Sequence, residues 1–336
     1  MKKCLFALLS AICLLFCACS ASAPAAETDA PTEYSEAYRA VTEIDHCVLE
    51  PDDRARLSDR DKEAYRVLTD GVLSHDGIVT LKPETVTVSE LIALLRESPY
   101  YFFLSKAEVS ANTVRLTYAY TAEKQAEMLS FMDDEFLRIS NYEVAPDDNR
   151  LDTILKIYLA VTHSMDYDHD RTDNKHLGSP LFIYPADEIY KALRDKKSLC
   201  YGFAYVMRFA LLQRGIDCFC EYGLCTAHGD GHEWIKFLYD GEWYNCDPAW
   251  DRVSDDYAKL IHFGKTDRER EVDTLIPTDF STYHTAEYAD LSCTDDRFFL
   301  FRDMVRFSYV SGHRFFMADR ENNEYIFDTS TFSFVE

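Results

Sequence analysis

The sequence predicts an α+β fold in which a helix that begins at a cysteine packs on an antiparallel sheet. The first observation is a stripe of apolar residues at helical spacing after Cys200. The second is a change to strand-like runs after Gly215, a glycine suited to ending that helix. The third is Asp240-Gly241 between two such runs, a strong signal for a tight hairpin turn. Helices that precede a group of strands are typical of α+β folds.

The N-terminus has the pattern of an export signal. Lys2 and Lys3 precede an apolar run at 4–16 that is too short to span a bilayer as a permanent helix. The segment "LLFCAC", which ends at Cys19, resembles the lipidation site of bacterial lipoproteins. We therefore expect Cys19 to be lipidated and the protein to be anchored at the extracytoplasmic face of a bacterial membrane. The alternative is cleavage after Ala23, which would give a soluble secreted protein.

The charge and the cysteines limit the possible partners. A formal net charge of −24 argues against nucleic acid, because phosphate contacts require clustered Lys and Arg. It leaves basic peptides as favoured partners. Cleavage before Cys19 would remove three of the eleven cysteines, at positions 4, 13 and 17, and leave eight whose irregular spacing predicts no particular disulfide pairing. No pattern requires a metal or a cofactor, and the sequence does not determine the oligomeric state.

Composition and pattern divide the chain into five parts. The residues after Cys19 are small, polar and contain proline, which predicts a flexible segment. We predict a signal peptide at 1–18, a tether at 19–36, an N-terminal α+β module at 37–148, a central domain at 149–294 and a C-terminal β extension at 295–336.

The N-terminal module shows secondary-structure patterns and no chemistry. "SELIALLRE" at 89–97 has helical apolar spacing, with Ser89 as the expected N-cap. The aromatic and β-branched run at 100–121, interrupted by Ser-Ala-Asn, predicts a hairpin. Residues 122–139 again have helical spacing.

The central domain begins with helices and continues with strands. An apolar helix is predicted from Leu151, and a second helix at 185–198, opened by Pro185 with Asp187 near its first turn. The helix at Cys200 follows. Strands are then predicted at 217–225, 232–239 and 242–250, and short aromatic strands with polar turns from about Asp295 onward.

Cys200 is predicted to lie in the first turn of its helix, on the apolar stripe that faces the sheet. Unpaired N–H groups and the macrodipole at a helix start stabilise a thiolate and lower its pKa. The same N–H groups could bind a developing oxyanion. The alternative interpretation is a buried structural thiol, since free cysteine is among the most buried residue types.

The hairpin supplies a possible base for that thiol. With Asp240-Gly241 as a two-residue loop, the register places Trp234 opposite Asp247. His232 then lies diagonally from Asp247 on the same face, about 7–8 Å away at the backbone. This is within reach of an imidazole–carboxylate hydrogen bond, which would orient the imidazole to take a thiol proton.

Three segments together resemble a known family. "SLCYGFAYVMRFALLQRGI", "GHEWIKF" and "EWYNCDPAWD" are similar to the motifs of the transglutaminase-like superfamily, which has a papain-like α+β fold. The resemblance implies that Cys200 is the nucleophile, His232 the base and Asp247 the orienting acid, and that 149–294 is a catalytic domain. It implies attack on an amide or peptide bond of a peptide or protein substrate through a thioester. Hydrolysis of the protease or amidase type is expected ahead of crosslinking.

Some assignments stay open. The alternatives to hydrolysis are acyl transfer to amines and a non-catalytic envelope protein that binds peptides with the same fold. Larger transglutaminases use a tryptophan before the nucleophile as an oxyanion donor, whereas all three tryptophans here follow Cys200, so Tyr184 or Tyr201 is the candidate donor. Trp234 is expected to line the acyl site or to pack in the core.

Neighbouring residues offer competing interpretations. His228 competes with His232, but its glycine neighbours place it in a loop. Asp251 competes with Asp247, but it follows Pro248, which is expected to end the strand and favours a turn. A zinc site, a disulfide or strand packing are the alternatives for a cysteine-rich group, namely Cys218, Cys220, Cys225 and His228.

Overall fold

The computed structural model describes residues 41–172, 187–225, 230–254, 256–272, 275–277 and 291–335. Glu36–Glu336 form one unit by their contacts. The signal peptide, Cys19, Tyr184 and His228 lie outside the described residues, so the predictions on them stay predictions. Among the described helices, none combines the length and the apolar character that crossing a bilayer requires.

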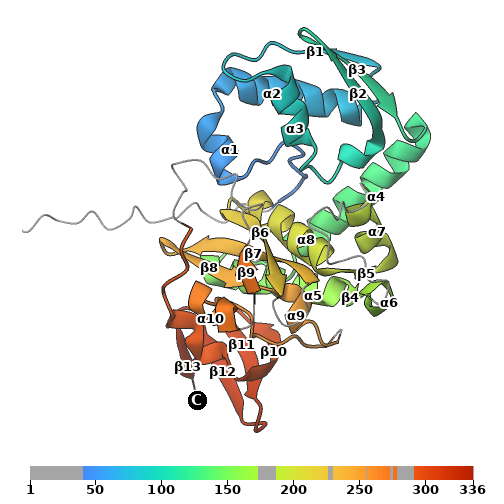
Figure 1. Ribbon diagram of the computed structural model, residues 1–336. Coiled ribbons are helices and arrows are strands. Elements are labelled where there is room, and N and C mark those ends of the chain that lie inside the picture. The colour runs from blue at the N-terminus through green and yellow to red at the C-terminus, as the bar shows by residue number, and fades with distance from the viewer. Residues whose placement is uncertain are drawn as a thin grey trace, which may run out of the picture. The chain divides into compact units, whose positions relative to one another are not determined.

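The N-terminal module is α+β, as predicted. Its sheet is antiparallel with strand order β1-β3-β2 (Figure 1). The elements are α1 (Pro51–Arg56), α2 (Asp59–Leu73), β1 (Ile78–Thr80), α3 (Val88–Leu95), the 3₁₀-helix η1 (Tyr101–Phe103), β2 (Leu104–Ser110), β3 (Thr113–Tyr118) and α4 (Ala122–Ser140).

The N-cap of α3 corrects the sequence prediction. Thr87, and not Ser89, caps the helix: its hydroxyl accepts from the Glu90 N–H at 3.2 Å, and the Glu90 carboxylate accepts from the Thr87 N–H at 2.7 Å. This reciprocal capping box needs an acidic or amide residue three positions after the cap. Thr87 has Glu90 at that position, whereas Ser89 has the apolar Ile92.

The predicted hairpin is present between β2 and β3. Ser110 pairs with Thr113, so the turn consists of Ala111 and Asn112. Ala111 has a φ of +51°, an uncommon backbone conformation for a residue with a β-carbon.

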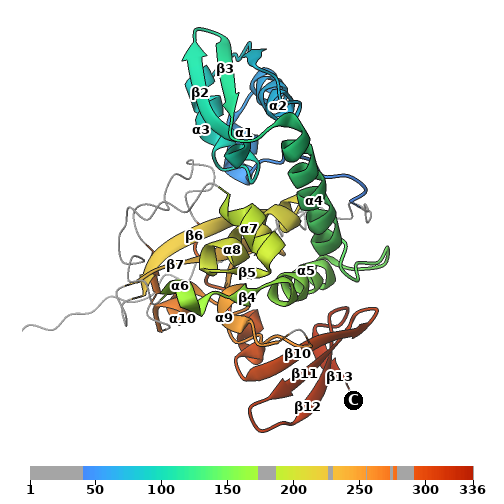
Figure 2. The same cartoon turned by 90° about the vertical axis from the view of Figure 1, so that its right-hand side faces the viewer.

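The central part contains the four-stranded antiparallel sheet, in the order β8-β7-β6-β9, with helix α8 packed on β6 and β7. Figures 1 and 2 show α8 against one face of these strands, with α5 beside it. The elements are α5 (Arg150–Ser164), β4 (Asp166–Tyr167), α6 (His169–Thr172), α7 (Glu188–Asp195), β5 (Lys197–Ser198), α8 (Cys200–Gln213), β6 (Cys218–Cys225), β7 (Asp230–Tyr239), β8 (Glu242–Cys246), α9 (Pro248–Asp251), α10 (Asp267–Val272) and β9 (Leu275–Pro277).

The helix at Cys200 confirms its predicted stripe and end. The stripe residues are all buried, namely Phe203, Ala204, Met207, Ala210 and Leu211. Gly215 follows the helix with a φ of +67°, as expected of a glycine that ends a helix in the left-handed conformation. The apolar face therefore fixes how α8 lies on the sheet, and with it the place of Cys200.

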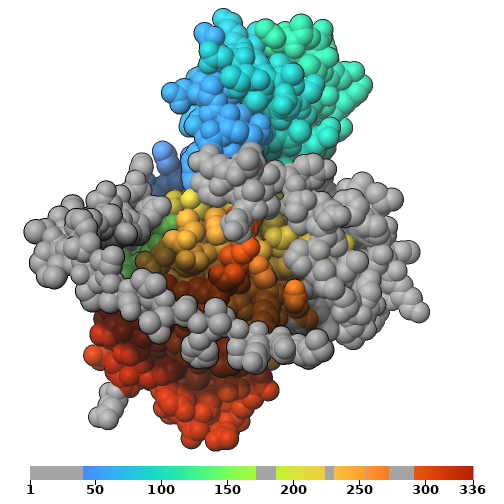
Figure 3. Space-filling model, turned by 60° about the vertical axis from the view of Figure 1, so that its left-hand side comes forward, coloured from blue at the N-terminus to red at the C-terminus, as the bar shows by residue number. Residues whose placement is uncertain are grey.

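The C-terminal extension is a four-stranded antiparallel meander that follows the 3₁₀-helix η4 (Arg297–Phe301). Its strands are β10 (Met304–Ser311), β11 (Arg314–Asp319), β12 (Glu324–Asp328) and β13 (Ser333–Val335). One cluster of buried apolar residues includes members from all three parts of the chain. On the face shown in Figure 3, atoms of the central part, in yellow and orange, are visible between those of the blue module and the red extension. The domain borders themselves stay predictions.

Candidate active site

Cys200 is the first residue of α8, and a glycine allows this helix start to pack closely. A β-carbon on Gly202 would lie 2.1 Å from the Ser198 hydroxyl oxygen and 3.2 Å from the β-carbon of Ala192. Such distances are far inside van der Waals contact, so only glycine fits here without displacement. Gly202 thus lets the first turn of α8 pack closely against β5 and α7, and this packing determines where the Cys200 thiol lies.

The β7–β8 hairpin confirms the predicted turn and register. Asp240 and Gly241 both have positive φ, +53° and +79°, as a type I′ turn requires. The ladder runs from Tyr239 opposite Glu242 to Ile235 opposite Cys246. The ladder ends at this pair, so the predicted pairing of Trp234 with Asp247 does not form.

Asp247 acts as the N-cap of α9 and faces His232. Its Oδ1 accepts from the Trp250 N–H at 3.2 Å, and its Oδ2 lies 2.5 Å from His232 Nε2. Pro248 explains the change from strand to helix, because it has no N–H for the ladder and suits the first helical position. The predicted His–Asp contact therefore forms by way of a helix cap.

The Cys200 thiol completes the group. It interacts with His232 by a hydrogen bond and accepts another from the Glu233 backbone N–H. Because Nε2 of His232 faces Asp247, Nδ1 is the ring nitrogen on the side of the sulfur. The structure thus brings together the three residues that the sequence selected. All three are buried, with Cys200 only 3% exposed.

The electrostatics favour a thiolate beside an imidazolium. Burial raises the pKa of the Cys200 thiol, but the positive charge and hydrogen bond of His232 outweigh this and bring it below the usual value. Burial lowers the pKa of His232, but the negative charges of Asp247 and Cys200 outweigh this and raise it. The pKa of Asp247 is held low despite burial, chiefly by His232 and then by Arg270.

Arg270 of α10 is a member of the site that the sequence analysis missed. Its Nη2 lies 3.1 Å from Asp247 Oδ2. The guanidinium carbon is 4.8 Å from the Trp234 ring centre and 5.3 Å from that of Trp250, within the range of cation–π contacts. Arginine 23 positions after the acid gives no spacing signal in the sequence.

The aromatic residues named from the sequence lie in different places. Trp234 is buried, packs against Trp250 and donates its Nε1–H to Asn245 Oδ1 at 2.8 Å. Of the two roles expected for Trp234, these contacts correspond to packing in the core. Tyr201 is half-buried and packs against Tyr205, with 4.1 Å between ring centres and the rings tilted by 33°. Tyr201 follows the nucleophile directly and remains the described candidate for contact with substrate.

Asp251 binds a different histidine. It lies at the end of α9, buried, where its carboxylate accepts from the Tyr158 hydroxyl at 2.7 Å and faces His262 Nδ1 at 2.8 Å. The Tyr158 hydroxyl also approaches the Asp247 carbonyl oxygen at 3.1 Å. Asp251 therefore supports the segment around Asp247 instead of replacing it.

The cysteines whose side chains the structure describes form no disulfides with one another, namely Cys47, Cys200, Cys218, Cys220, Cys246 and Cys293. Cys218 and Cys220 lie on β6, and burial raises the pKa of both. Within the described residues, no group of three or more His, Cys, Asp or Glu could hold a metal ion. The side chains of Cys225 and His228, the other members of the proposed zinc group, lie outside the description.

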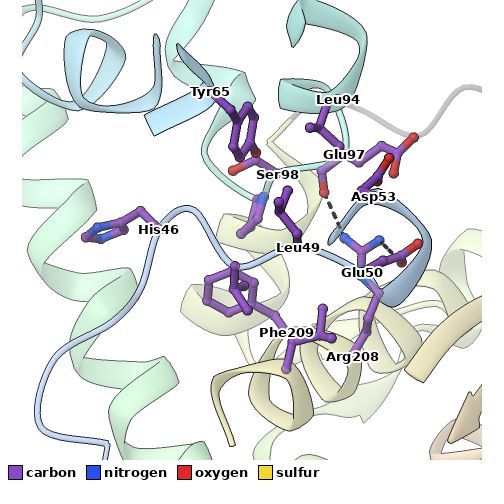
Figure 4. Close-up of a pocket in the computed structure, with 13 residues that line it drawn as sticks. His46, Leu49, Glu50, Asp53, Tyr65, Leu94, Glu97, Ser98, Arg208 and Phe209 are labelled. Atoms are coloured by element: carbon purple, nitrogen blue, oxygen red, sulfur yellow. Dashed lines mark hydrogen bonds and ion pairs between the residues drawn. The ribbon is translucent and has the colours of Figure 1, made fainter. Parts of the chain in front are cut away.

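Two neighbouring cavities lie beside α8, and Arg208, Glu50 and Glu97 line both of them. The smaller, of about 30 Å³, is shown in Figure 4, where Arg208 bonds to the Glu50 carboxylate at 2.6 Å and to the Glu97 carbonyl at 2.8 Å. The larger, of about 570 Å³, is predominantly acidic and is also lined by Tyr205, Tyr222 and Glu233. Its lining includes Glu233, the residue after His232, and does not include Cys200, His232 or Asp247.

Two of the carboxyl groups that line this larger cavity, those of Glu97 and Glu233, have raised pKa values. Burial, together with the Glu50 charge, raises the pKa of Glu97 to about 7. Burial and the Cys200 charge raise the pKa of Glu233, and its Oε2 is buried with no hydrogen-bond partner among the residues that the structure describes. A cationic group in the cavity would stabilise the ionised form of both.

One family model matches the part of the chain that contains Cys200, His232 and Asp247. Residues 138–248 match the model of the transglutaminase-like superfamily. A search of curated proteins found no relative. Among solved structures, one titled as a TGase is 15% identical, with 43% of this chain and 44% of that chain covered and a TM-score of 0.31. The periplasmic domain of TgpA from Pseudomonas aeruginosa is also 15% identical, with 41% and 55% covered and a TM-score of 0.25. This chain thus spans about half the length of these structures or less.

Proposed function

Because residues 138–248 carry the transglutaminase-like core of that superfamily, we propose that the protein is a cysteine enzyme that cleaves amide or peptide bonds through a thioester. The observation that carries the proposal is the contact chain from the Cys200 thiol through His232 to Asp247. A purely structural role for either Cys200 or His232 would not explain why the thiol and the imidazole are in contact with each other.

The residues account for each step of the reaction. The Cys200 thiolate attacks the carbonyl carbon, a C–S bond forms, and the carbonyl electrons move onto oxygen. The N-terminal N–H groups and dipole of α8 stabilise that oxyanion. The oxyanion collapses, the C–N bond breaks, and the His232 imidazolium donates its proton to the leaving amine.

The second half restores the enzyme. Neutral His232 takes a proton from water as the water oxygen attacks the thioester carbonyl, the C–O bond forms, and the C–S bond breaks. A carboxylic acid leaves and the thiolate–imidazolium pair returns. An amine that replaced water would give transfer in place of hydrolysis. We favour hydrolysis and retain transfer as the alternative.

We propose a peptide or protein as substrate and an extracytoplasmic location, with Cys19 as the lipid anchor. The large acidic cavity beside Glu233 supports a peptide that carries basic side chains. Tyr201, next to the nucleophile and half-buried, is the residue we propose to contact the substrate. Processing that is blocked by globomycin would support the anchor, whereas unchanged processing would favour secretion.

The proposal is tested by incubating the protein with a library of glutamine- and lysine-containing peptides, with and without a primary amine, and analysing the products by mass spectrometry. Cleavage or deamidation that requires no amine supports hydrolysis, and amine incorporation supports transfer. Cys200→Ala should abolish either product, while the matched control Cys47→Ala, at a buried cysteine that lines neither cavity, should retain it. If the wild-type protein binds these peptides and leaves them unchanged, the protein is a binding module and the enzymatic proposal fails.

A further inference from the structure

Arg270 and His232 share one oxygen of Asp247. Arg270 Nη2 lies 3.1 Å from Oδ2, and His232 Nε2 lies 2.5 Å from the same atom. Arg270 is 2% exposed and Asp247 is fully buried, so little solvent screens these charges. The carboxylate is therefore held between two basic groups.

Two indole rings hold this arrangement in place. The His232 ring stacks on Trp250 with 4.6 Å between ring centres and is nearly parallel to Trp234 at 6.3 Å. The Arg270 guanidinium lies over the same two rings. A planar cation on an aromatic face is stabilised there and restricted in orientation.

Helix α10 is anchored so that it presents Arg270 to the site. A helix of six residues has little stability alone, so its contacts decide where it lies. Asp267 accepts from Asn245 Nδ2 at 2.9 Å and from the Cys293 N–H at 2.9 Å. The Glu269 carboxylate caps the helix start and binds Arg302. The position of Arg270 is thus built by contacts on both sides of α10.

We infer that Arg270 is a positioning residue that fixes the Asp247 carboxylate and limits how tightly His232 holds its proton. The inference rests on the proposed function and adds a fourth residue to its site. The charged and titratable groups that face His232 are Cys200 from α8, Glu233 from its own strand, Asp247 before α9 and Arg270 from α10, with His262 close to Asp247.

The physical reason is competition for one carboxylate. If Arg270 were neutral, the full charge of the buried Asp247 would act on the imidazole alone. The imidazolium would then be more stable and would give its proton to the leaving amine more slowly. With Arg270 in place, Asp247 still orients His232, while the guanidinium balances part of the carboxylate charge.

The test compares Arg270→Gln, which keeps a donor and removes the charge, with Arg270→Lys, which keeps the charge. The readout is the titration of the His232 ring, followed by NMR, together with the pH dependence of Cys200 alkylation. For Arg270→Gln we expect His232 to lose its proton about one pH unit higher and peptide turnover to fall on the order of tenfold. Arg270→Lys should restore most of both.

Arg302→Gln is the matched control, since Arg302 anchors α10 through Glu269 and is not bonded to Asp247. If it moves the His232 titration as much as Arg270→Gln does, Arg270 merely holds the helix and the inference is wrong. An unchanged or lowered titration in Arg270→Gln would also overturn it.

If Arg270→Gln does not fold, the wild-type protein supplies a second test. A guanidinium bonded to buried Asp247 should give slowly exchanging Nη protons in the NMR spectrum, and Asp247→Asn should weaken that protection. Rapid exchange in the wild-type protein would contradict the inference. Absence of turnover by the wild-type protein, together with an elevated His232 titration in Arg270→Gln, would reject the proposed function and leave the role of Arg270 intact.

Discussion

Two histidine–aspartate pairs in this protein have similar geometry and different surroundings. His232 Nε2 lies 2.5 Å from Asp247 Oδ2, and His313 Nδ1 lies 2.6 Å from Asp152 Oδ2. In both pairs the carboxylate is fully buried, and in both the histidine pKa is raised. A pair of this kind is therefore not in itself a catalytic feature.

The surroundings of the His313–Asp152 pair attach the C-terminal sheet to the central part of the chain. Asp152 also accepts from the Asn149 N–H at 2.8 Å, as part of the capping box of α5, and from the Thr329 hydroxyl. His313 lies between β10 and β11 and is 31% exposed. These contacts join the C-terminal sheet to the start of α5. The first pair differs because a helix begins at Cys200 beside its imidazole, and this third group makes chemistry possible.

Substitution of each aspartate should separate the two roles. Asp247→Asn should reduce kcat/KM for peptide turnover on the order of a thousandfold or more, because the imidazole loses its orienting charge. Asp152→Asn should change turnover by less than about threefold and lower the free energy of unfolding by about 1–3 kcal/mol. Steady-state kinetics and urea unfolding measure the two quantities. Equal losses of turnover would end the distinction between the pairs.

The comparison also predicts that the start of α8 matters more than its end. Gly202→Ala should push the first turn away from Ser198, lower the free energy of unfolding by about 1–3 kcal/mol and slow Cys200 alkylation severalfold. Gly215→Ala, at the other end of α8, meets no atom within 4 Å and strains only a positive φ. It should cost about 1 kcal/mol and leave alkylation unchanged. Similar alkylation in the two variants would show that the helix start does not set the thiol position.

The pH dependence of alkylation tests the electrostatics of the first pair. The thiolate is the reactive form, so the iodoacetamide rate rises as pH passes upward through the thiol pKa. The pKa of Cys200 is lowered and that of Cys220 is raised, although Cys220 is the more exposed. We expect Cys200 to react faster near pH 7, with its rate rising at lower pH than that of Cys220.

One variant in each His–Asp pair tests which pair controls the pH profile of Cys200 alkylation. Asp247→Asn should move the rise of the Cys200 rate to higher pH, because the imidazolium that stabilises the thiolate is weakened. His313→Gln, in the second pair, should leave the profile unchanged. Peptide mapping by mass spectrometry assigns each rate to its thiol. Preferential labelling of Cys220 would mean that exposure, and not activation, governs reactivity.

The smallest expected effect is the pH-dependent stability that His313 contributes. Its pKa is raised by the hydrogen bond that the ring donates to the Asp152 carboxylate, so folding favours the protonated ring. That stabilisation is fully present below the ordinary histidine pKa of about 6.5 and is lost as pH rises through the raised value. His313→Gln should therefore destabilise by about 1 kcal/mol or less at pH 5.5 and by less at high pH. Urea unfolding at several pH values measures this, and a difference that grows with pH would contradict it.

Local patterns in the sequence predicted much of the site, for identifiable reasons. The Asp240-Gly241 turn fixed the register of β7 and β8, because two residues with positive φ permit one tight geometry. The apolar stripe fixed the face of α8 on the sheet. The same local reasoning was wrong at Ser89, because a capping box depends on a reciprocal partner and Thr87 has one.

By itself the sequence determined which residues could do chemistry: a thiol at a helix start, a histidine and an acid on one hairpin, and a motif pattern similar to that of a known superfamily. The tertiary structure decided how they meet. Asp247 reaches His232 as a helix cap beyond the end of the strand, and Arg270 joins them from a six-residue helix held by side chains distant in the sequence. Short elements of this kind have too little local stability to fix their own position, so tertiary packing determines where they lie. Local sequence patterns do not predict that packing.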